Sequence, residues 1–477
     1  MKGPNLGLQS MIRPVFRLLQ GAFAPRSAAS GRGYRTVPPV VIVDEPVRPA
    51  DEIDEHEKQW SSVRPPGGRF WVAYNGEIDG VDRWGRFSAV SVDDRLAPMS
   101  LTFVIAVILA PAWVYAVGTA VATVRFARRA TPSGPEPPPV SLLKPLHGAE
   151  PGLYENLRSF AEQDYPVVQV VLGVNDAKDS ALPGAQALIR DLPASDIALI
   201  LDPPVRGSNL KVANLENMLS AARHDILVIA DSDMRVGQRY LGAVTAPLRD
   251  PRTGLVTCLY EGVSTGGFWS ELGALHINFG FLPSALVAAA LGIGHGCFGA
   301  TIALRRDTLD RIGGFARLRD ELADDRRIGD AVREQGLAVV LSRYVVEARV
   351  SEPSFASLWH HELRWARTVR AITPAGFAGS VLTHPAALAA LGAAAGRFGL
   401  TSCIFVAISC LLRWATAVVI ADALGFTTGG LWLLPVRDAL SFAVFVASFF
   451  GRTVSWRDQL FHVDANGRMT IEGDKAR

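Results

Sequence analysis

The chain has few cysteines and almost no excess of charge, and both shortages narrow what it can be. Only four of its 477 residues are cysteine, and they form no paired framework and no cysteine metal motif: Cys258, Cys297, Cys403 and Cys410. This absence fits a folded part in a reducing compartment. The net charge of +2 at pH 7 argues against a nucleic-acid partner, which requires a strongly basic surface.

Acidic residues are also missing from the first 43 positions, which hold six basic residues, and an acidic run follows at 51–57. A basic, acid-poor start is typical of a targeting peptide. The alternatives, which we favour, are a disordered tail or a start upstream of the natural one at Met99. We therefore interpret residues 1–97 as an N-terminal extension.

Long apolar segments are what the chain has in abundance, with 49% hydrophobic residues and a positive mean hydropathy. Residues 98–124 are uncharged, and at ~1.5 Å per residue they can cross a hydrocarbon core of ~30 Å as a transmembrane helix. Arg125, Arg128 and Arg129 follow at once. Because an excess of arginine marks the cytoplasmic side, we expect the central region to face the cytosol.

Apolar residues return after about residue 375. We expect a C-terminal transmembrane region at 385–452, with spans at 399–426 and 430–450, a candidate third at 385–395, and a cytosolic tail at 453–477 that matches Arg452, Arg457 and Arg468. The apolar stretch 273–294 is short and glycine-rich, which favours a re-entrant or interfacial piece over a span.

Charged residues interrupt the C-terminal apolar segments, among them Arg413, Arg437 and Asp438. A charge at the middle of a bilayer is costly. We therefore expect these side chains to lie at an interface, to pair, or to line a groove that faces the protein.

The region 131–375 shows the alternation of an α/β domain, after a stiff proline-rich linker at 131–139. We expect strands at 140–143, 167–174, 197–201 and 226–230, and helices at 153–163, 185–191 and 210–222. A doubly wound sheet places ligand groups just past the carboxyl ends of its strands.

Carboxylates follow two of these strands. Asp176 follows 167–174, where it could hold a base or ribose or merely cap a turn. Asp231 and Asp233 follow 226–230. Two carboxylates at the tip of a buried strand repel each other unless a cation neutralises them, and Mg²⁺ and Mn²⁺ prefer such oxygen ligands beside phosphates. The D-x-D pattern therefore predicts a divalent-metal site.

Further polar residues lie downstream. Lys211 and Asn214, near a helix start, could contact a diphosphate or be solvated. Asp325, next to Asp324, opens a helical stretch, where acids also favour the helix dipole. A neighbouring carboxylate raises the proton affinity of the other, which suits a general base.

A cluster at 361–365 completes the candidate residues. His361, Arg364 and Trp365 lie within about one helical turn. Arginine can pair with phosphate through two hydrogen bonds, and tryptophan can pack on an acceptor or at a membrane interface. An amphipathic interfacial helix is an alternative that is compatible with both roles.

The order of these pieces resembles the ceramide glucosyltransferase family, over roughly residues 99–460. The motifs that carry the resemblance are 141–148 (SLLKPLHG), 156–157 (NL), 163–166 (QDYP), 174–176 (VND), 209–214 (NLKVAN), 231–233 (DSD), 323–325 (ADD) and 364–365 (RW). The C-terminal stretches 432–442 and 447–451 look like the bacterial branch that includes hopanoid-biosynthesis glycosyltransferases.

The resemblance implies a GT-A type Rossmann-like mixed sheet flanked by helices, with transmembrane helices at both ends. It implies that Asp176 holds the uridine and that Asp325 is the catalytic base. Asp231 and Asp233 would bind the diphosphate through Mg²⁺ or Mn²⁺, with Asp233 favoured as the direct ligand.

The resemblance also assigns a UDP-sugar-binding role to other residues: Lys211, Asn214, His361, Arg364 and Trp365. Here His361 stands where the family has glutamine or arginine, which admits a pH-dependent phosphate contact. Asp324-Asp325 replaces the usual Glu-Asp.

The implied activity is inverting transfer of one sugar, glucose or N-acetylglucosamine, from a UDP-sugar to a lipid hydroxyl. Ceramide is the acceptor that the family implies, and a hopanoid polyol is the alternative. Two further alternatives are a processive polysaccharide synthase, which about three spans argue against, and a non-catalytic lipid-binding membrane protein. We expect a multi-pass integral protein of the bacterial inner membrane.

Overall fold

The structure, a computed structural model, describes residues 101–129, 137–201, 203–293 and 296–451, and the backbone of 453–456, 459–463 and 469–471. The interpretations of residues 1–97 and of Arg452, Arg457 and Arg468 lie outside the described residues. So do 98–100 of the first span and most of the linker.

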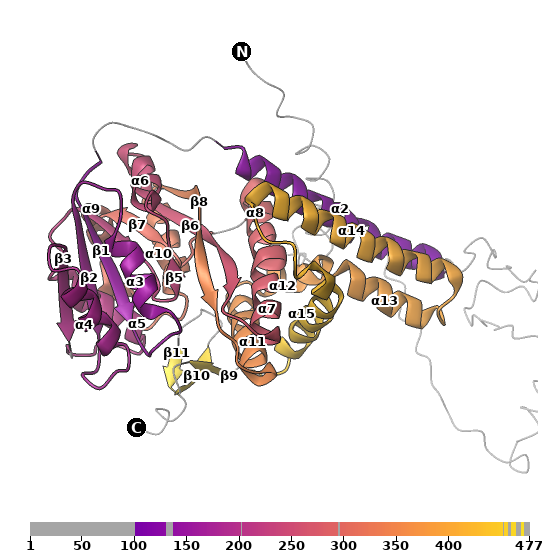
Figure 1. The fold of residues 1–477 in the computed structure, drawn as a ribbon. Helices are drawn as coiled ribbons and strands as arrows, with labels where there is room; N and C mark the ends of the chain where they lie inside the picture. The colour runs from indigo at the N-terminus through magenta and orange to yellow at the C-terminus, as the bar shows by residue number, and fades with distance from the viewer. Residues whose placement is uncertain are drawn as a thin grey trace, which may run out of the picture. The chain divides into compact units, whose positions relative to one another are not determined.

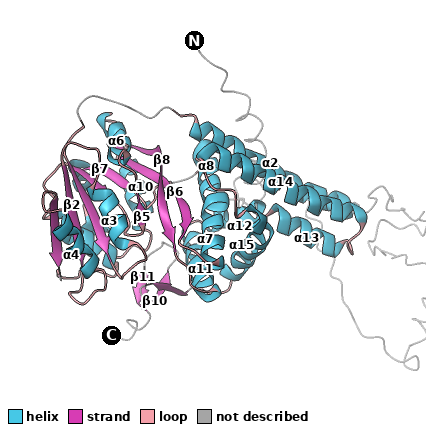
Figure 2. Ribbon diagram, viewed as in Figure 1, coloured by secondary structure: helices cyan, strands magenta, loops and turns pink. Residues whose placement is uncertain are grey.

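An eight-stranded mixed sheet, in the order β3-β2-β1-β4-β7-β6-β8-β5, organises the central region (Figures 1 and 2). The first four strands in this order run parallel, β7 is antiparallel to β4 and β6, β8 is parallel to β6, and β5 is antiparallel to β8. The strands are β1 (Val140–Leu146), β2 (Val168–Val174), β3 (Asp196–Leu201), β4 (Ile226–Ile229), β5 (Met234–Arg235), β6 (Thr253–Ser264), β7 (Ile302–Arg305) and β8 (Ala338–Val350).

Helices cover both faces of this sheet because successive strand residues point to opposite sides. Leu142 of β1 packs in one core with α3, whereas Leu143 packs in a second core with α5 and α10. These helices and their neighbours are α3 (Leu153–Ala161), α4 (Leu182–Asp191), α5 (Leu210–Leu219), α6 (Tyr240–Thr245), α9 (Arg306–Arg311) and α10 (Asp324–Glu334), with short turns η1 (Ala246–Arg249) and η3 (Phe315–Leu318). The expected mixed sheet flanked by helices is confirmed.

A helical part lies beside the sheet (Figure 1). It includes α2, the first helix of the described residues. α2 and α14 run side by side (Figure 1). Trp113 Nε1 of α2 donates a hydrogen bond to Ser409 Oγ of α14 at 2.9 Å. Its elements are α2 (Leu101–Ala127), α7 (Phe268–His276), η2 (Ile277–Phe281), α8 (Leu282–Leu291), α11 (Phe355–Ile372), α12 (Pro374–Gly379), η4 (Ser380–Thr383), α13 (Pro385–Ala395), α14 (Leu400–Leu424), η5 (Leu431–Leu433) and α15 (Leu434–Ser448).

Within the described residues, four helical segments are long and apolar enough to cross a membrane: 101–127, 268–291, 400–424 and 431–448. A fifth candidate is the pair 374–383 and 385–395, which is bent by 72°. The segment 268–291 is longer than the sequence indicated. Its helix begins at Phe268 and continues through the π-helix η2 without a break, since the glycines of this stretch lie inside the helix.

Arg413, Arg437 and Asp438 are all paired, which confirms one of the arrangements expected for them. Arg413 Nε lies 3.2 and 3.1 Å from the two carboxylate oxygens of Asp438. Arg437 pairs with Glu362, on α11. After these helices the backbone forms a small antiparallel sheet of β9 (Thr453–Trp456), β10 (Gln459–Val463) and β11 (Met469–Ile471).

Candidate active site

Asp231 and Asp233 follow β4, at the carboxyl edge that β4 shares with its parallel neighbour β1. The Lys211 ammonium lies 2.6 Å from Asp231 Oδ1 and 3.6 Å from Asp324 Oδ2. Burial opposes the charge on Lys211, but Asp231 and Asp324 outweigh burial and raise its pKa. One lysine therefore bridges the end of β4 and the start of α10, two segments about ninety residues apart.

Asp325 lies in the first turn of α10, on the same cluster. Its Oδ2 accepts a hydrogen bond from the Gly299 N–H at 2.9 Å. Burial and the charge of Asp324 raise the pKa of Asp325 to about 6, while Lys211 opposes the rise. A carboxylate with this pKa is ionised at neutral pH and still accepts a proton readily, as a general base requires.

The backbone at Gly299, just before β7, lies against two carboxylates that the sequence singled out, those of Asp231 and Asp325. A Cβ atom built at this position would lie 2.9 Å from Asp231 Oδ2 and 3.2 Å from Lys211 Nζ. The backbone therefore passes so close to Asp231 that only glycine fits without displacing the charged groups. Nothing in the sequence signals this role, because the constraint comes from a segment distant in the chain.

Lys144 is a second residue that sequence reasoning did not single out. It is 0% exposed in β1, its Nζ donates to the Asp231 carbonyl oxygen at 2.5 Å, and it lies 3.7 Å from the centre of the Phe160 ring. Burial lowers the pKa of Lys144 to about 7, against the charges of Asp233 and Asp231. A lysine inside an apolar strand was the available signal, since a buried ammonium needs partners.

Asp233 has the electrostatics of a cation ligand. Burial and the charges of Asp231 and Glu150 raise its pKa to about 7, and it forms no ion pair with a described residue. No three His, Cys, Asp or Glu side chains group closely enough to hold an ion within the described part of the chain. The carboxylates of Asp231 and Asp233 thus fit an ion whose other ligands are water and phosphate oxygens, which is how Mg²⁺ usually binds.

The other predicted residues of the nucleotide half differ in how they are placed. Asp176 is exposed past β2, where its Oδ1 accepts from the Lys178 N–H at 2.8 Å. Asn214 is 1% exposed, and its amide donates to the Gly173 carbonyl of β2 at 2.8 Å. Asn214 therefore supports the end of β2 from beneath.

Asn209 explains why the motif around Lys211 begins with asparagine. Its side chain caps α5 by accepting from the backbone N–H groups of Lys211 and Val212. The same side chain donates to the Glu321 carbonyl at 2.7 Å. One buried amide thus fixes both Lys211 and the segment that leads to Asp325.

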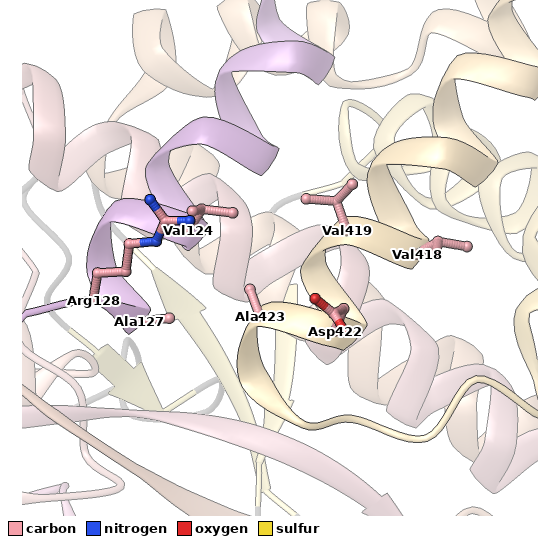
Figure 3. Close-up of a pocket in the computed structure, with 7 residues that line it drawn as sticks. All are labelled: Val124, Ala127, Arg128, Val418, Val419, Asp422 and Ala423. Atoms are coloured by element: carbon pink, nitrogen blue, oxygen red, sulfur yellow. The ribbon is translucent and has the colours of Figure 1, made fainter.

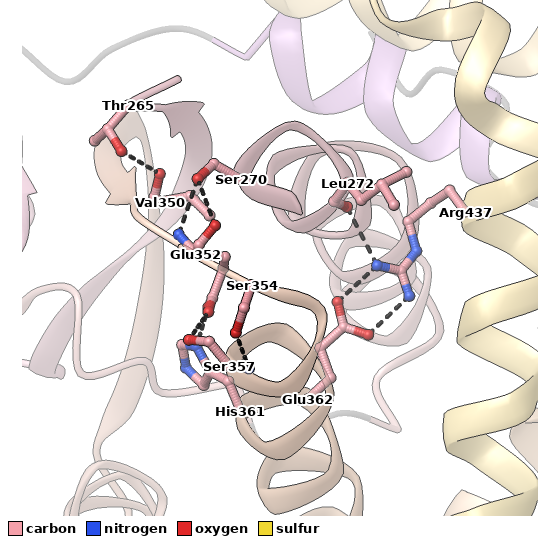
Figure 4. A network of polar contacts seen from close by, with 10 residues as sticks. All are labelled: Thr265, Ser270, Leu272, Val350, Glu352, Ser354, Ser357, His361, Glu362 and Arg437. Carbon is pink, nitrogen blue, oxygen red and sulfur yellow. Dashed lines mark hydrogen bonds and ion pairs between the residues drawn. The ribbon is translucent and has the colours of Figure 1, made fainter. Parts of the chain in front are cut away.

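His361, Arg364 and Trp365 lie on α11, and Figure 4 shows the polar network around the first of them. His361 Nδ1 lies 2.7 Å from Glu352 Oε1, and its ring contacts Trp365 at 4.2 Å between centroids. Burial opposes ionisation of Glu352, but hydrogen bonds from His361 and Ser357 hold its pKa below the usual range. The histidine that departs from the family pattern therefore has a protein partner.

Tyr260 lies between the carboxylates and α11. Burial contributes most to raising the pKa of Tyr260. The charges of Asp233 and Asp325 raise it further, whereas Arg364 lowers it. Its ring stacks on Phe281 at 4.9 Å, and Phe281 meets Phe298 edge-on at 5.5 Å. All three rings are partly exposed, and Phe298 adjoins Gly299. We call Tyr260, Phe281 and Phe298 the aromatic row.

A cavity of about 470 Å³ lies elsewhere, between α2 and α14 (Figure 3). Apolar side chains of both helices line it together with Arg128 and Asp422. None of the predicted site residues borders it, so it does not belong to the carboxylate cluster.

Comparison with known proteins identifies relatives over part of the chain. It is 24% identical to ceramide glucosyltransferase 1 of Caenorhabditis elegans over 243 residues, or 50% of this chain and 52% of that protein. It is 34% identical to a Komagataella phaffii ceramide glucosyltransferase over 117 residues, or 24% of this chain and 23% of that protein. The chain thus spans about half the length, or less, of these curated relatives.

Among solved structures, a mannosyltransferase from Pyrobaculum calidifontis, in complex with GDP-Man and Mn²⁺, superposes with a TM-score of 0.43 at 17% identity. The match covers 73% of this chain and 99% of that one. Glucosyl-3-phosphoglycerate synthase from Mycobacterium tuberculosis, with Mn²⁺, UDP and glucosyl-3-phosphoglycerate, superposes with a TM-score of 0.31 at 17% identity. That match covers 49% of this chain and 79% of the synthase chain.

The family model named glycosyl transferase family 21 matches residues 83–469, which is most of the chain. This match includes every residue of the carboxylate cluster and of α11 described above. It confirms the family that the order of motifs predicted, and the protein belongs to glycosyl transferase family 21.

Proposed function

We propose that the protein is a membrane-bound inverting glycosyltransferase that moves one sugar from a UDP-sugar to a lipid hydroxyl. The observation that carries the proposal is the meeting of Asp231, Asp324 and Asp325 around Lys211, with Asp233 next to Asp231, in a chain whose apolar helices are long enough to cross a membrane. The family match and the resemblance to ceramide glucosyltransferases support this class of reaction.

The donor end of the proposed site is formed by Asp231, Asp233 and Lys211. A Mg²⁺ or Mn²⁺ ion on the two carboxylates would neutralise charge that develops on the departing UDP. Asp231 already shares an oxygen with Lys211 at 2.6 Å, which favours Asp233 as the direct ligand. Asp176, exposed past β2, is placed where a uridine could reach it, and Arg364 supplies a second cation for phosphate.

The transfer step is assigned to Asp325. The acceptor hydroxyl attacks the anomeric carbon from the face opposite UDP, forming the new C–O bond as the bond to the phosphate oxygen breaks. The hydroxyl proton passes to Asp325, and the bonding electrons leave with UDP. Attack from the opposite face inverts the anomeric carbon. The hydrogen bond from the Gly299 N–H to Asp325 Oδ2 holds the carboxylate in one orientation during this transfer.

A lipid acceptor is supported by the surface next to Asp325. The aromatic row leads from Gly299 to Phe281, which ends η2 within the apolar segment 268–291. On the other side, Trp359 and the partly exposed Trp365 lie on the amphipathic helix α11. Aromatic side chains favour a membrane interface, so a lipid hydroxyl could reach Asp325 without the lipid leaving the bilayer. Ceramide is the acceptor we favour, and a hopanoid polyol is the alternative.

The test is mass spectrometry of lipids from membranes that contain the protein and receive UDP-glucose or UDP-N-acetylglucosamine. We expect one new lipid carrying a single hexose or N-acetylhexosamine, formed only with divalent metal, and none with Asp325→Asn. A ladder of products with many sugars would instead favour processive synthesis. Absence of any glycolipid and of UDP release with both donors and with ceramide and hopanoid acceptors would refute the proposal.

A further inference from the structure

Arg437 lies in an unusual environment for an arginine. It is 0% exposed in the apolar helix α15, yet each of its three side-chain nitrogens has a hydrogen-bond partner (Figure 4 shows the contacts with Glu362 and Leu272). Nη1 and Nη2 each lie 2.7 Å from one oxygen of Glu362, Nη1 also reaches the Leu272 carbonyl at 3.3 Å, and Nε reaches Ser441 Oγ at 3.1 Å. The guanidinium therefore holds α15, α11 and α7 at a single point.

Glu362, the partner of Arg437, belongs to the helix that carries the predicted phosphate and acceptor contacts. It is 4% exposed on α11, directly after His361 and two residues before Arg364. On a neighbouring side of α11, His361 contacts Glu352, which precedes the helix. The orientation of Arg364 and Trp365 is thus set by two contacts, one to the sheet side and one to α15.

The next residue of α15 makes a separate connection. Asp438 pairs with Arg413 of α14, whose Nε and Nη2 lie 3.1 to 3.2 Å from its oxygens. Successive helix residues point about 100° apart, so adjacent residues can hold different neighbours. Arg437 therefore reaches the site helix, whereas Asp438 reaches a candidate membrane span.

A buried ion pair is a poor way to add stability, because removing both charges from water costs about as much as their attraction returns. What a bidentate arginine–carboxylate pair supplies is direction, since two parallel hydrogen bonds allow one relative placement. An apolar contact between α11 and α15 would tolerate sliding and rotation. The pair thus constrains where α11 lies relative to the apolar helices.

We propose that Glu362 and Arg437 are positioning residues that place α11 so that Trp365 meets a lipid acceptor held beside the apolar helices. This inference rests on the proposed function. It assigns to the pair the encounter with the acceptor, whereas the donor is held mainly by the carboxylate cluster, with Arg364 as one further contact. A shift of about 1 Å in a positioned group can cost about 100-fold in rate, so loss of the fork has a measurable effect.

The test uses the full-length protein in lipid nanodiscs and the variant Arg437→Lys, which keeps the charge and loses the planar fork. We expect the KM for the lipid acceptor to rise about tenfold or more, while the KM for the UDP-sugar and metal-dependent UDP-sugar binding change by no more than about threefold, because Arg364 is only one of several donor contacts. Amide hydrogen exchange of 355–372 should become faster. The double variant Glu362→Gln with Arg437→Met should repeat the acceptor defect if the single variant does not fold.

Arg413→Lys is the matched control, because it alters the adjacent ion pair of α15 without touching α11. Equal effects of Arg413→Lys and Arg437→Lys on the acceptor KM, or a parallel loss of donor and acceptor affinity, would overturn the positioning role. An inactive wild-type protein would instead refute the proposed function. Hydrogen exchange along α11 still decides the positioning role in that case, since unchanged exchange in Arg437→Lys contradicts it.

Discussion

Two clusters of charged residues in this protein differ in how they are balanced. At the edge of the sheet, four carboxylates (Asp231, Asp233, Asp324 and Asp325) surround the two ammonium groups of Lys144 and Lys211. Among the apolar helices, two arginines each meet one carboxylate with bidentate geometry: Arg437 with Glu362 and Arg413 with Asp438.

The difference in balance separates a site from a structural contact. The helix pairs satisfy themselves, so they need nothing further from outside the protein. The carboxylate cluster is buried and keeps an excess of negative charge. Burial first, and then this charge, raise the pKa of Asp233 and Asp325 and leave room for a cation and a proton. An unbalanced cluster is therefore the better place to expect chemistry.

Replacing the base should have the largest effect on activity. We expect Asp325→Asn to reduce transfer about 100- to 10,000-fold, because the amide cannot accept the acceptor proton. UDP-sugar binding, measured by calorimetry, should survive. Asp330→Asn on the same helix is the control, with near-normal transfer. Comparable rates for Asp325→Asn and the wild type would remove Asp325 from the role of base.

Breaking the balanced cluster should act on stability instead. Glu362→Gln leaves Arg437 buried without its counter-charge, and we expect a loss of about 3–5 kcal/mol in the free energy of unfolding. Chemical denaturation in detergent measures this loss. Glu162→Gln, which alters an exposed i,i+4 pair, should change stability by less than about 1 kcal/mol. Equal effects of the two variants would contradict a buried, tightly paired Arg437.

Filling the narrow space at Gly299 should disturb the unbalanced cluster without changing a charge. In Gly299→Ala the added Cβ pushes on Asp231 and Lys211, and we expect transfer to fall by up to about 100-fold. Gly242→Ala is the control, because no atom lies within 4 Å of a Cβ added there. Full activity of Gly299→Ala would show that the close approach is not required.

Removing one carboxylate of the D-x-D pair should separate metal binding from stability. We expect Asp233→Asn to weaken Mn²⁺ binding about tenfold or more in a titration. The same variant should be as stable as the wild type or more stable without metal, because carboxylate repulsion falls. Asp250→Asn, in the bend between η1 and β6, is the control. An unchanged metal titration would exclude Asp233 as a ligand.

The smallest expected effect is a shift in pH dependence. Activity should rise with pH through about 6, since Asp325 must lose its proton to act as a base and its pKa is raised to that value. Because the charge of Asp324 contributes to the rise, Asp324→Asn should move the acidic limb of the kcat/KM profile to lower pH. An unmoved limb in Asp324→Asn would argue that another group controls it.

The catalytic half of the site could be predicted because its residues stand at strand ends and helix starts. Asp231 and Asp233 follow a run of apolar β-branched residues, and Asp325 opens a strongly amphipathic helix, so local patterns place them. Gly299 could not be predicted, because its constraint is a contact across space. Whether Asn214 supports a strand or binds a ligand could not be predicted, because a buried amide in either role looks the same in sequence.

The first half of the sheet could likewise be predicted, whereas the second half could not. β1, β2, β3 and β4 are short parallel strands with helices between them, and the expected ranges differ from the observed ones by a few residues. β6 and β8 are long and pair directly with each other, although an apolar helix and β7 lie between them in the sequence. Their pairing depends on contacts between segments about eighty residues apart, which no local pattern reports.

The adjacency of Arg437 and Asp438 has a consequence for anyone who recombines this protein with a relative. A junction placed between α11 and α14 would separate Glu362 from Arg437 while leaving Arg413 with Asp438. One residue inserted before position 437 would turn both side chains by about 100° and disconnect α15 from both neighbours. A working chimera must therefore inherit α11, α14 and α15 together, as one exchangeable module.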